Sequence, residues 1–449
     1  MDEFKRRRAE LTKIPGDKQG AGIVLGGRDD WRDLLRWVPG ATKKAPSTPK
    51  KCLENVLTTL LHCPAWQGVV RHNVFTDRME LAGALPTAES HVNQDAAGAW
   101  RDGPALWCAA WFNSTLGFEP SNDMMERSLA EVARSNPYHP VRDYLQGLKW
   151  DGVVRTDGML CQMFGAENSP ANCAIGSKWL ISAVARVMRP GCQVDHMLVL
   201  EGPQGTRKST ALRTLVGDAW FRNSPLELRD KDAMQALRGC WVYEFDELDS
   251  FRGRDATRVK SFITGRVDSY RPPYGRHPID VARQCAFAGS TNEERYLSDP
   301  TGNRRFWPVL CGAIDIPALL AARDQLWAEA FHRFEAGELW YVPEGAIADE
   351  LRALQGERQE LDPWVDQIQK WLDGLLEIRR QDGVTTQQAM ESGLDLKAAS
   401  VGRKEETRVG HVLKSLGWER RREMKNGVRR YRYYPPAPPQ TAFDLPGLV

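Results

Sequence analysis

The sequence lacks several features that would place it in a special class of protein. None of its nine cysteines forms a Cys-x-x-Cys pair, so their spacing indicates neither a zinc site nor a disulfide framework. No apolar run of 18 residues is present, and the charged start MDEFKRRRAELTK is unlike a secretory signal, so we expect a cytoplasmic protein with no membrane partner. The formal net charge is only +2, so affinity for nucleic acid must come from local basic patches.

The chain does contain enough material for several domains. Its 449 residues are 42% hydrophobic and 27% charged, which is the composition of an ordinary globular protein too long for one domain. We expect a flexible basic segment over 1–50 and a mainly helical domain over 51–171, with Ser121 as a helix cap. An α/β domain with a parallel sheet should follow over 172–345, then a winged-helix-like domain over 363–434 and a disordered proline-rich tail over 435–449.

Three short apolar runs predict strands of the α/β domain. They are HMLVLEG (196–202), CWVYEFDEL (240–248) and CAFAGSTN (285–292). Continuous apolar runs of this length, separated by helical patterns, are typical of strands buried on both faces of a parallel sheet. The residues that follow each run therefore decide what chemistry the domain has.

The first run leads into a stretch that is similar to a phosphate-binding loop. Gly202 and Lys208-Ser209 have the spacing of that motif, although Arg207 stands where the motif has glycine. Backbone N–H groups at a helix start would bind phosphate, Lys208 would reach the β- and γ-phosphates, and Ser209 would ligate Mg²⁺. A plain turn between a core strand and a helix is the alternative. The expected cofactor-binding residues are Gly202, Pro203, Gln204, Gly205, Thr206, Arg207, Lys208, Ser209 and Thr210.

Polar residues also follow the other two strands. The second strand ends in carboxylates that would hold Mg²⁺ and orient an attacking water, unless the strand simply runs out into solvent. The third ends in an asparagine suited to sense the γ-phosphate, and two arginines in the next loop would stabilise a transferring phosphoryl group. The expected catalytic set is Lys208, Glu244, Asp246, Glu247, Asn292, Arg304 and Arg305, and the expected metal ligands are Ser209, Glu244 and Asp246.

Six blocks over roughly 135–425 together resemble the virulence-associated protein E family of phages and mobile islands, which is related to superfamily-three helicases. The blocks are HPVRDYLQGLKWDGVVR, PGCQVDHMLVLEGPQGTRKST, YEFDELD, VKSFITGRVDSYRPPYGR, FAGSTNEERYLSDPTGNRRFWPV and VLKSLGWERRR. The resemblance implies an AAA+-type ATPase that uses ATP and Mg²⁺ and works on DNA as a homo-oligomeric ring, with a hexamer expected. Lys208 and Ser209 match the loop positions. Glu244 and Glu247 match the paired acids, and Glu247 is our choice to activate water. Asn292 matches the sensor, and Arg304 or Arg305 the arginine finger.

Two basic clusters are expected to contact DNA, with a merely solvated surface as the alternative for each. The block over 260–276 matches the DNA-contacting hairpin in the pore of superfamily-three rings, and its cations and aromatic rings suit phosphates and bases. A second cluster surrounds a predicted hairpin that turns at Asn426-Gly427. The expected DNA-binding residues are Lys260, Arg266, Arg271, Tyr274, Arg276, Arg420, Arg421, Arg422, Lys425, Arg429 and Arg430.

Two functions remain open from the sequence. One is an ATP-driven DNA helicase or translocase acting in phage or mobile-element replication. The other is a nucleotide-switched initiator or regulator that binds DNA but hydrolyses little ATP. The carboxylates and the arginine pair favour hydrolysis, because a protein that only binds nucleotide needs neither. The first 150 residues show no compelling paired-acid motif, so the sequence does not support a primase.

Overall fold

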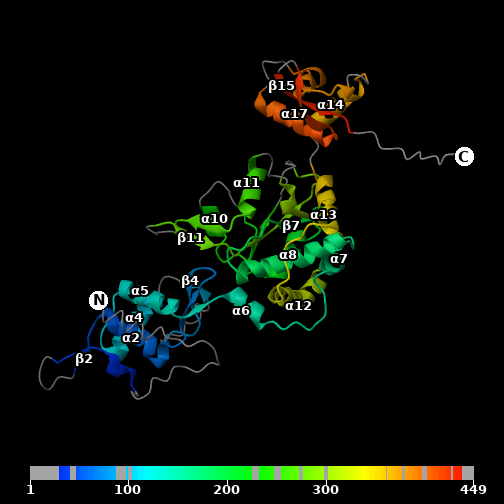
Figure 1. Cartoon of the computed structure of the whole chain (residues 1–449). Coiled ribbons are helices and arrows are strands. Elements are labelled where there is room, and N and C mark those ends of the chain that lie inside the picture. Colours follow the sequence, from blue (N-terminus) through cyan, green and yellow to red (C-terminus); the bar gives the residue numbers. More distant parts are fainter. Residues whose placement is uncertain are drawn as a thin grey trace. The chain divides into compact units, whose positions relative to one another are not determined.

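The computed structural model describes residues 30–40, 47–86, 98–99, 104–224, 232–246, 254–272, 277–297, 302–359, 362–376, 380–396, 402–425 and 428–436 (Figure 1). The chain divides into two compact units, Met1–Gly147 and Leu148–Val449. Within the described ranges, we find no helix with the length and apolar character needed to span a membrane.

The first unit combines helices with a small sheet. Its helices are η1 (Trp31–Leu34), α2 (Leu53–His62), η2 (Pro64–Trp66), α4 (Pro104–Leu116), α5 (Asn122–Arg134) and α6 (Pro140–Gly147). A four-stranded sheet has the order β5-β4-β3-β6, formed by Gly98–Ala99, Arg78–Leu81, Val70–Asn73 and Pro137–Tyr138. The expectation of a mainly helical domain did not include this sheet, because strands of two to four residues leave almost no periodic signal.

Local sequence explains several boundaries in this unit. Ser121 caps α5 as expected, its hydroxyl accepting from the Met124 N–H at 3.3 Å. The core contains Trp66, Phe112 and Leu129. Thr48 and Pro49, which the sequence placed in a flexible segment, form strand β2 and pair with β1 (Trp37–Val38). The unit ends at Gly147, before the expected boundary at 171.

A five-stranded parallel sheet is the centre of the second unit. Its order is β13-β7-β12-β9-β8, formed by Phe306–Leu310, Met197–Glu201, Ala286–Thr291, Val242–Phe245 and Phe221–Arg222. All residues of β7, β9 and β12 are buried, which confirms the α/β fold with a parallel sheet that the three apolar runs predicted. The order places β12 between β7 and β9, although it follows both along the chain.

Helices cover this sheet (Figure 1). They are α7 (Met159–Phe164), α8 (Pro170–Met188), α9 (Lys208–Val216), α10 (Asp232–Ala236), α11 (Arg254–Ile263), η4 (Asn303–Arg305), α12 (Ile316–Glu335) and α13 (Ala346–Glu357). Three buried tryptophans connect neighbouring elements through hydrogen bonds from their indole N–H groups to backbone carbonyls. Trp179 of α8 donates to the Phe287 carbonyl at 2.9 Å, Trp241 to that of Ala183 at 2.9 Å, and Trp327 of α12 to that of Leu215 at 2.7 Å.

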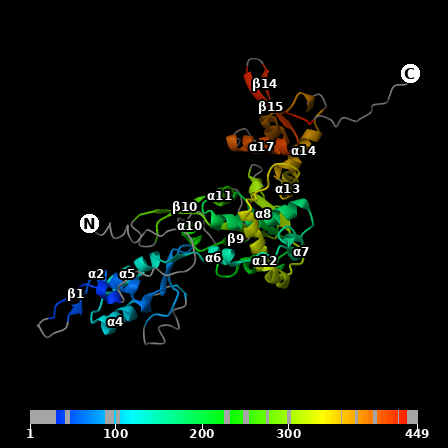
Figure 2. The ribbon, with the colours of Figure 1, turned by 60° about the horizontal axis from the view of Figure 1, so that its bottom comes forward.

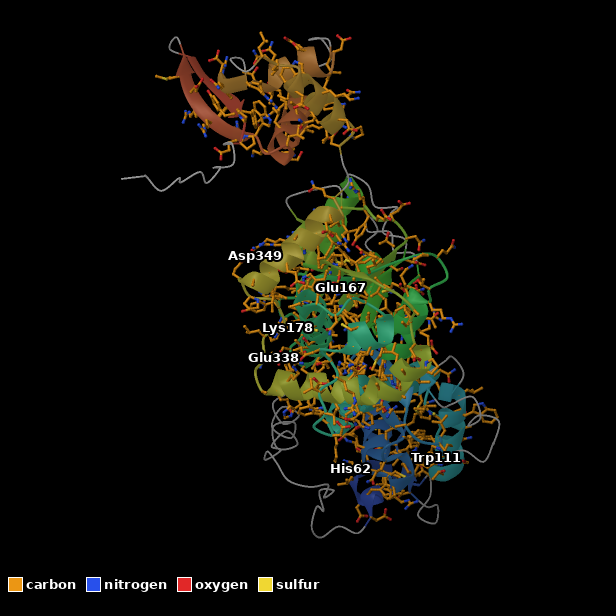
Figure 3. The ribbon with its side chains drawn as sticks, turned by 90° about the vertical axis from the view of Figure 1, so that its right-hand side faces the viewer. His62, Trp111, Glu167, Lys178, Glu338 and Asp349 are labelled. Carbon is orange, nitrogen blue, oxygen red and sulfur yellow. The ribbon has the colours of Figure 1, made fainter. Side chains whose placement is uncertain are left out.

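Two further features of the sheet domain are an ion pair on α8 and a two-stranded hairpin. Lys178 of α8 and Glu338, just after α12, point toward one another with their Nζ and Oε1 atoms 2.7 Å apart (Figure 3). Strands β10 (Val267–Tyr270) and β11 (Ile279–Ala282) form an antiparallel hairpin that extends from the sheet domain near α10 (Figure 2).

A C-terminal module follows within the same unit, over the described residues 362–436. It contains α14 (Trp364–Asp373), α16 (Thr386–Gln388), η5 (Ala389–Gly393), α17 (Arg403–Ser415) and the antiparallel strands β14 (Glu419–Lys425) and β15 (Val428–Tyr434). Its own core includes Ile368, Val409, Leu413 and Trp418. Because Lys425 pairs with Val428, two residues connect the strands, as expected for the hairpin. Asn426 and Gly427 themselves, and the tail from 437 onward, lie outside the described residues.

Candidate functional site

The carboxyl ends of β7, β12 and β9 lie side by side at one edge of the five-stranded sheet. Thr291 of β12 pairs with Glu201 of β7, and Gly289 pairs with Phe245 of β9. The residues that leave these three strands therefore start at the same edge, where ligands of open α/β sheets generally bind. This register brings together three of the stretches that the sequence selected for their chemistry.

The loop after β7 has a backbone that only certain residues adopt easily. Gly202 has φ +141°, Gly205 φ +86° and Arg207 φ +65° with ψ +28°, all on the side of φ that favours glycine. The motif has glycine at the position of Arg207, and the structure shows why, since this residue is left-handed. Arg207 occupies that conformation at a cost of about 1–2 kcal/mol. The chain therefore adopts the left-handed conformation at this position although the residue is not glycine.

Lys208 opens α9 and lies in the hollow of this loop. Its side chain is buried, and Nζ donates to the carbonyls of Gly202 at 2.6 Å and Pro203 at 3.1 Å. Nζ also donates to the side-chain oxygen of Asn292 at 3.0 Å. The structure thus brings Lys208 and Asn292 into direct contact across 84 positions of sequence. The ammonium group faces the space enclosed by loop backbone, where an anion would compete for it.

Ser209 contacts the carboxylate of Glu244 beside this lysine. Its hydroxyl donates to Glu244 Oε1 at 2.7 Å, and Glu244 is fully buried at the end of β9. Burial raises the pKa of the Glu244 carboxyl, and the bond from Ser209 opposes that shift. The second oxygen, Oε2, is buried and has no hydrogen-bond partner among the described residues. A buried carboxylate oxygen without a partner is costly unless a cation or water satisfies it, so this pair fits Mg²⁺.

Of the other two expected carboxylates, the structure describes Asp246 but not Glu247. Asp246 follows β9 at the same edge, is exposed, and accepts from the Ser290 hydroxyl at 3.2 Å. Glu247 lies outside the described residues. Within the described part of the chain no group of three or more His, Cys, Asp or Glu side chains gathers around one point. Mg²⁺ commonly takes one or two carboxylates and completes its shell with water and phosphate, so two such ligands suffice.

Arg304 and Arg305 lie at the amino ends of the strands, opposite the loop over 202–207. They belong to η4, which directly precedes β13, and the first residue of β13 pairs with Met197 at the start of β7. The five residues of β7 therefore separate them from the loop by about 15 Å. Arg304 is exposed, and Arg305 Nε is buried without a partner in the described part of the structure. Neither arginine reaches Lys208 of its own chain.

The expected DNA-contacting block over 260–276 is only partly suited to that role. Arg266 and Arg271 are exposed at the two ends of β10, where Arg266 Nε also donates to the Gly191 carbonyl at 2.8 Å. Lys260 is buried, and its Nζ donates to Asn303 at 3.4 Å, so it is not available to a DNA backbone and that expectation is wrong. Tyr274 and Arg276 lie outside the described residues.

A groove of about 630 Å³ crosses the C-terminal module between α17 and the hairpin β14–β15. Arg420, Arg421 and Arg422 are exposed on β14, and Arg420 stacks 3.7 Å above the centre of the Tyr431 ring in the groove. The side chains of Lys425, Arg429 and Arg430 lie outside the described residues. The groove also contains side chains that the sequence analysis missed, which come from one face of α17 and from the start of α16: Arg403, Thr407, His411, Lys414, Thr385 and Thr386. Their spacing along α17 follows a helical period and was the signal that could have revealed them.

The chain is similar to solved structures at low sequence identity. Among solved structures, the chain is similar to the apo structure of the NrS-1 C-terminal region, with 13% identity, a TM-score of 0.45, and coverage of 82% of this chain and 96% of that chain. An A form of the same region gives 12% identity and a TM-score of 0.43 with the same coverage. None of the curated proteins compared matches the sequence.

A protein-family model matches one continuous part of the chain. The model of the virulence-associated protein E-like domain matches residues 145–360, a range that begins just before the second unit and extends just past α13. It includes the five strands of the parallel sheet, the loop over 202–207, Asn292 and both arginines. Residues 145–360 of this chain therefore form a virulence-associated protein E-like domain.

Proposed function

We propose that the chain is an ATP-hydrolysing motor of the AAA+, superfamily-three type that acts on DNA during phage or mobile-element replication. The contact that carries this proposal is the one between Lys208 Nζ and Asn292, with the Ser209–Glu244 bond beside it. A lysine inside a bent glycine-containing loop, a sensor amide and a hydroxyl–carboxylate pair are the parts that phosphoryl transfer needs, and they lie at one edge of the sheet.

The roles of the residues follow from their positions. The loop over 202–210 would bind the phosphates through its backbone N–H groups, and Lys208 would leave its carbonyl partners to meet the β- and γ-phosphates. Ser209 and Glu244 would hold Mg²⁺, which supplies charge neutralisation for the phosphoryl oxygens when it is bound, and Asp246 would reach it through water. We assign the orientation of the attacking water to Glu247, on the family resemblance.

A ring of identical subunits would complete this site. Arg304 and Arg305 lie about 15 Å from their own loop, at the far end of β7. Arginine stabilises a transferring phosphoryl group by direct contact, so a pair at that edge would act on the nucleotide of a neighbouring copy. A head-to-tail interface of this kind closes into a ring, and we propose a hexamer.

DNA would meet the protein at two surfaces. The hairpin β10–β11 presents Arg266 and Arg271 and would contact a single strand in the pore. We propose that the C-terminal module is a winged helix, which its helices and its following hairpin support. Its groove is lined by Arg403, Lys414 and Arg420 together with the Tyr431 ring. Cations close to hydroxyls and a ring are suited to phosphates and bases, so we assign duplex DNA to this groove.

The test is ATP turnover with and without DNA, measured together with strand displacement. We expect DNA to stimulate turnover of the wild-type chain, and Lys208→Ala to abolish it while Arg213→Gln, an exposed change on the same helix, does not. Turnover of Lys208→Ala within twofold of wild type would reject this loop as the site. ATP binding with almost no hydrolysis at any DNA concentration would instead support the nucleotide-switched initiator or regulator.

A further inference from the structure

The last residue of strand β7 belongs to a buried hydrogen-bonded cluster next to the candidate nucleotide site. Glu201 lies directly before Gly202, with 6% of its side chain exposed. Arg358, at the end of α13, donates from Nε to Oε1 at 3.1 Å and to Oε2 at 3.2 Å, and from Nη2 to Oε2 at 3.1 Å. The Tyr296 hydroxyl donates to Oε1 at 2.8 Å. Bidentate arginine–carboxylate pairs fix orientation as well as distance.

The backbone of Arg358 holds the segment that follows Asn292. Its carbonyl accepts from the N–H groups of Tyr296 at 3.1 Å and Leu297 at 3.0 Å. Arg358 is therefore bonded to two parts of the candidate nucleotide site at once. Its side chain holds the residue before the loop, and its carbonyl holds the residues after the asparagine. We name Glu201, Tyr296 and Arg358 the Glu201 cluster.

The two segments that this cluster joins also carry the partners of Lys208. Lys208 Nζ donates to the Gly202 carbonyl at 2.6 Å and to the side-chain oxygen of Asn292 at 3.0 Å. Gly202 directly follows the buried carboxylate, and Asn292 lies four residues before Tyr296. The N–H of Gly202 donates to the carbonyl of Thr291 at 3.3 Å, which joins the same two segments once more. The cluster therefore helps to set where the asparagine lies relative to the lysine.

We propose that the Glu201 cluster positions Asn292 against the terminal phosphate of bound ATP. This inference rests on the proposed function, because it concerns the same nucleotide site. The members of the cluster are positioning residues, since they act on the nucleotide through Asn292. Backbone N–H groups of the loop over 202–210 would bind phosphates that ATP and ADP share. An asparagine beside Lys208 would contact the phosphate that only ATP has, so the cluster should affect binding of ATP and not of ADP.

Calorimetric titration of the full chain with Mg²⁺ and either ADP or the β,γ-imido analogue of ATP tests this without requiring turnover. Tyr296→Phe removes one donor from the cluster and leaves the ion pair of Glu201 in place. We expect its affinity for the analogue to fall about tenfold, the scale of one hydrogen bond to a charged group, and its affinity for ADP to stay within about twofold of wild type. Arg352→Gln, an exposed change on α13, is the matched control and should bind both nucleotides as wild type does.

A second variant separates the geometry of the ion pair from its charge. Arg358→Lys keeps a positive charge beside Glu201 but replaces the planar fork of donors by a single ammonium group. We expect the same selective loss of affinity for the analogue, because charge alone does not fix the orientation of the carboxylate. Full wild-type affinity for the analogue in Arg358→Lys would overturn the positioning role of this arginine. If this variant does not fold, Tyr296→Phe still decides the matter.

A double variant shows whether the cluster acts through Asn292. Asn292→Ala alone should lower affinity for the analogue and not for ADP. Tyr296→Phe added to Asn292→Ala should then cause no further loss, because the group that the cluster positions is already gone. Losses that add in the double variant would mean that the cluster reaches the nucleotide by another route, and they would overturn the proposal.

The outcomes distinguish this proposal from the motor. Tyr296→Phe with unchanged affinity for the analogue, or with equal losses for both nucleotides, overturns the role of the cluster and leaves the nucleotide site in place. The expected selective loss, in a chain that binds ATP but does not hydrolyse it, upholds the cluster and rejects the motor. A wild-type chain that binds neither nucleotide rejects both.

Discussion

At the carboxyl edge of the sheet the candidate nucleotide residues touch one another, whereas the expected DNA-contacting cations mostly face solvent. Lys208 bonds to Asn292, and Ser209 bonds to Glu244, all within 3.0 Å. By contrast Arg422 is exposed, and Arg421 is exposed too, with an ion pair to Glu419 of its own strand at 3.0 Å and the Tyr434 ring 5.2 Å away. The side chains of the first region already bond to one another, whereas those of the second are mostly exposed.

The difference follows from burial. Glu244 is fully buried, and buried polar groups are hydrogen-bonded to each other or to a bound ion, so their arrangement is fixed before a ligand arrives. Exposed ion pairs such as Arg421–Glu419 contribute little to stability, and their geometry is set by whatever binds. Substitutions at the sheet edge should therefore change catalysis steeply, and substitutions on the basic surfaces should change affinity gradually.

After Lys208→Ala, the largest effect is expected from the arginines at the amino ends of the strands. Arg304→Ala combined with Arg305→Ala should lower turnover on the order of 10³-fold or more while ATP still binds, because a transition-state contact is lost. Mixing this variant with Lys208→Ala should restore part of the turnover, since each subunit supplies what the other lacks. A strict monomer with full activity in sedimentation and turnover assays contradicts the ring.

The carboxylates at the assembled edge should give the next largest effect. Glu247→Gln should bind ATP normally and hydrolyse it about 10²–10⁴-fold more slowly, because the group that orients water is gone. Glu244→Gln should weaken Mg²⁺ binding as well, since it removes a ligand. Single-turnover kinetics with a Mg²⁺ titration distinguish the two. If Asp246→Asn alone shows the slow-hydrolysis behaviour, our assignment of Glu247 is wrong.

A smaller and graded effect is expected on the basic groove. Lys414→Gln and Arg420→Gln should each weaken duplex binding and flatten its salt dependence by about one unit of slope, the change expected for one lost phosphate contact. Basal ATP turnover should stay unchanged. Lys370→Gln, an exposed change on α14 outside the groove, is the control. Equal salt slopes in all three variants would show that the groove does not bind DNA.

The smallest effect should come from the backbone of the loop. Arg207→Gly should raise the free energy of unfolding by up to about 1 kcal/mol, because glycine adopts the left-handed conformation at lower cost, partly offset by its freedom in the unfolded chain. Arg207→Ala keeps the strain and removes the side chain, so it serves as the control. Thermal unfolding measures both. A less stable Arg207→Gly variant would mean that the side chain itself stabilises the loop.

The sequence predicted the sheet domain better than the surfaces, for reasons visible in single residues. An apolar run predicted the strand that ends at Glu201, and the spacing of Gly202 and Lys208-Ser209 predicted the helix that begins at Lys208. The sequence predicted that Lys208 and Asn292 both follow strands of one sheet, but not that they are in contact. Their contact depends on β7 and β12 being neighbours, and long-range pairing sets the order of strands.

Other features were not accessible from the sequence. Lys260 looked like a surface cation, but α11 turns it toward Asn303 in the interior. Glu201 and Arg358 are separated by 157 positions, and nothing in the local pattern of either residue indicates its partner. The strands of the first unit are too short to show alternation.

The most direct measurement is a calorimetric titration of ATP with Mg²⁺ into the wild-type chain and into Lys208→Ala. The account predicts one ATP bound per wild-type chain. It predicts binding at least about tenfold weaker in Lys208→Ala, from the loss of a charge-assisted contact, with unchanged thermal unfolding of the protein. Equal affinity in the two proteins, or no binding to the wild type, would contradict the claim that the edge of the sheet around Lys208 is a nucleotide site.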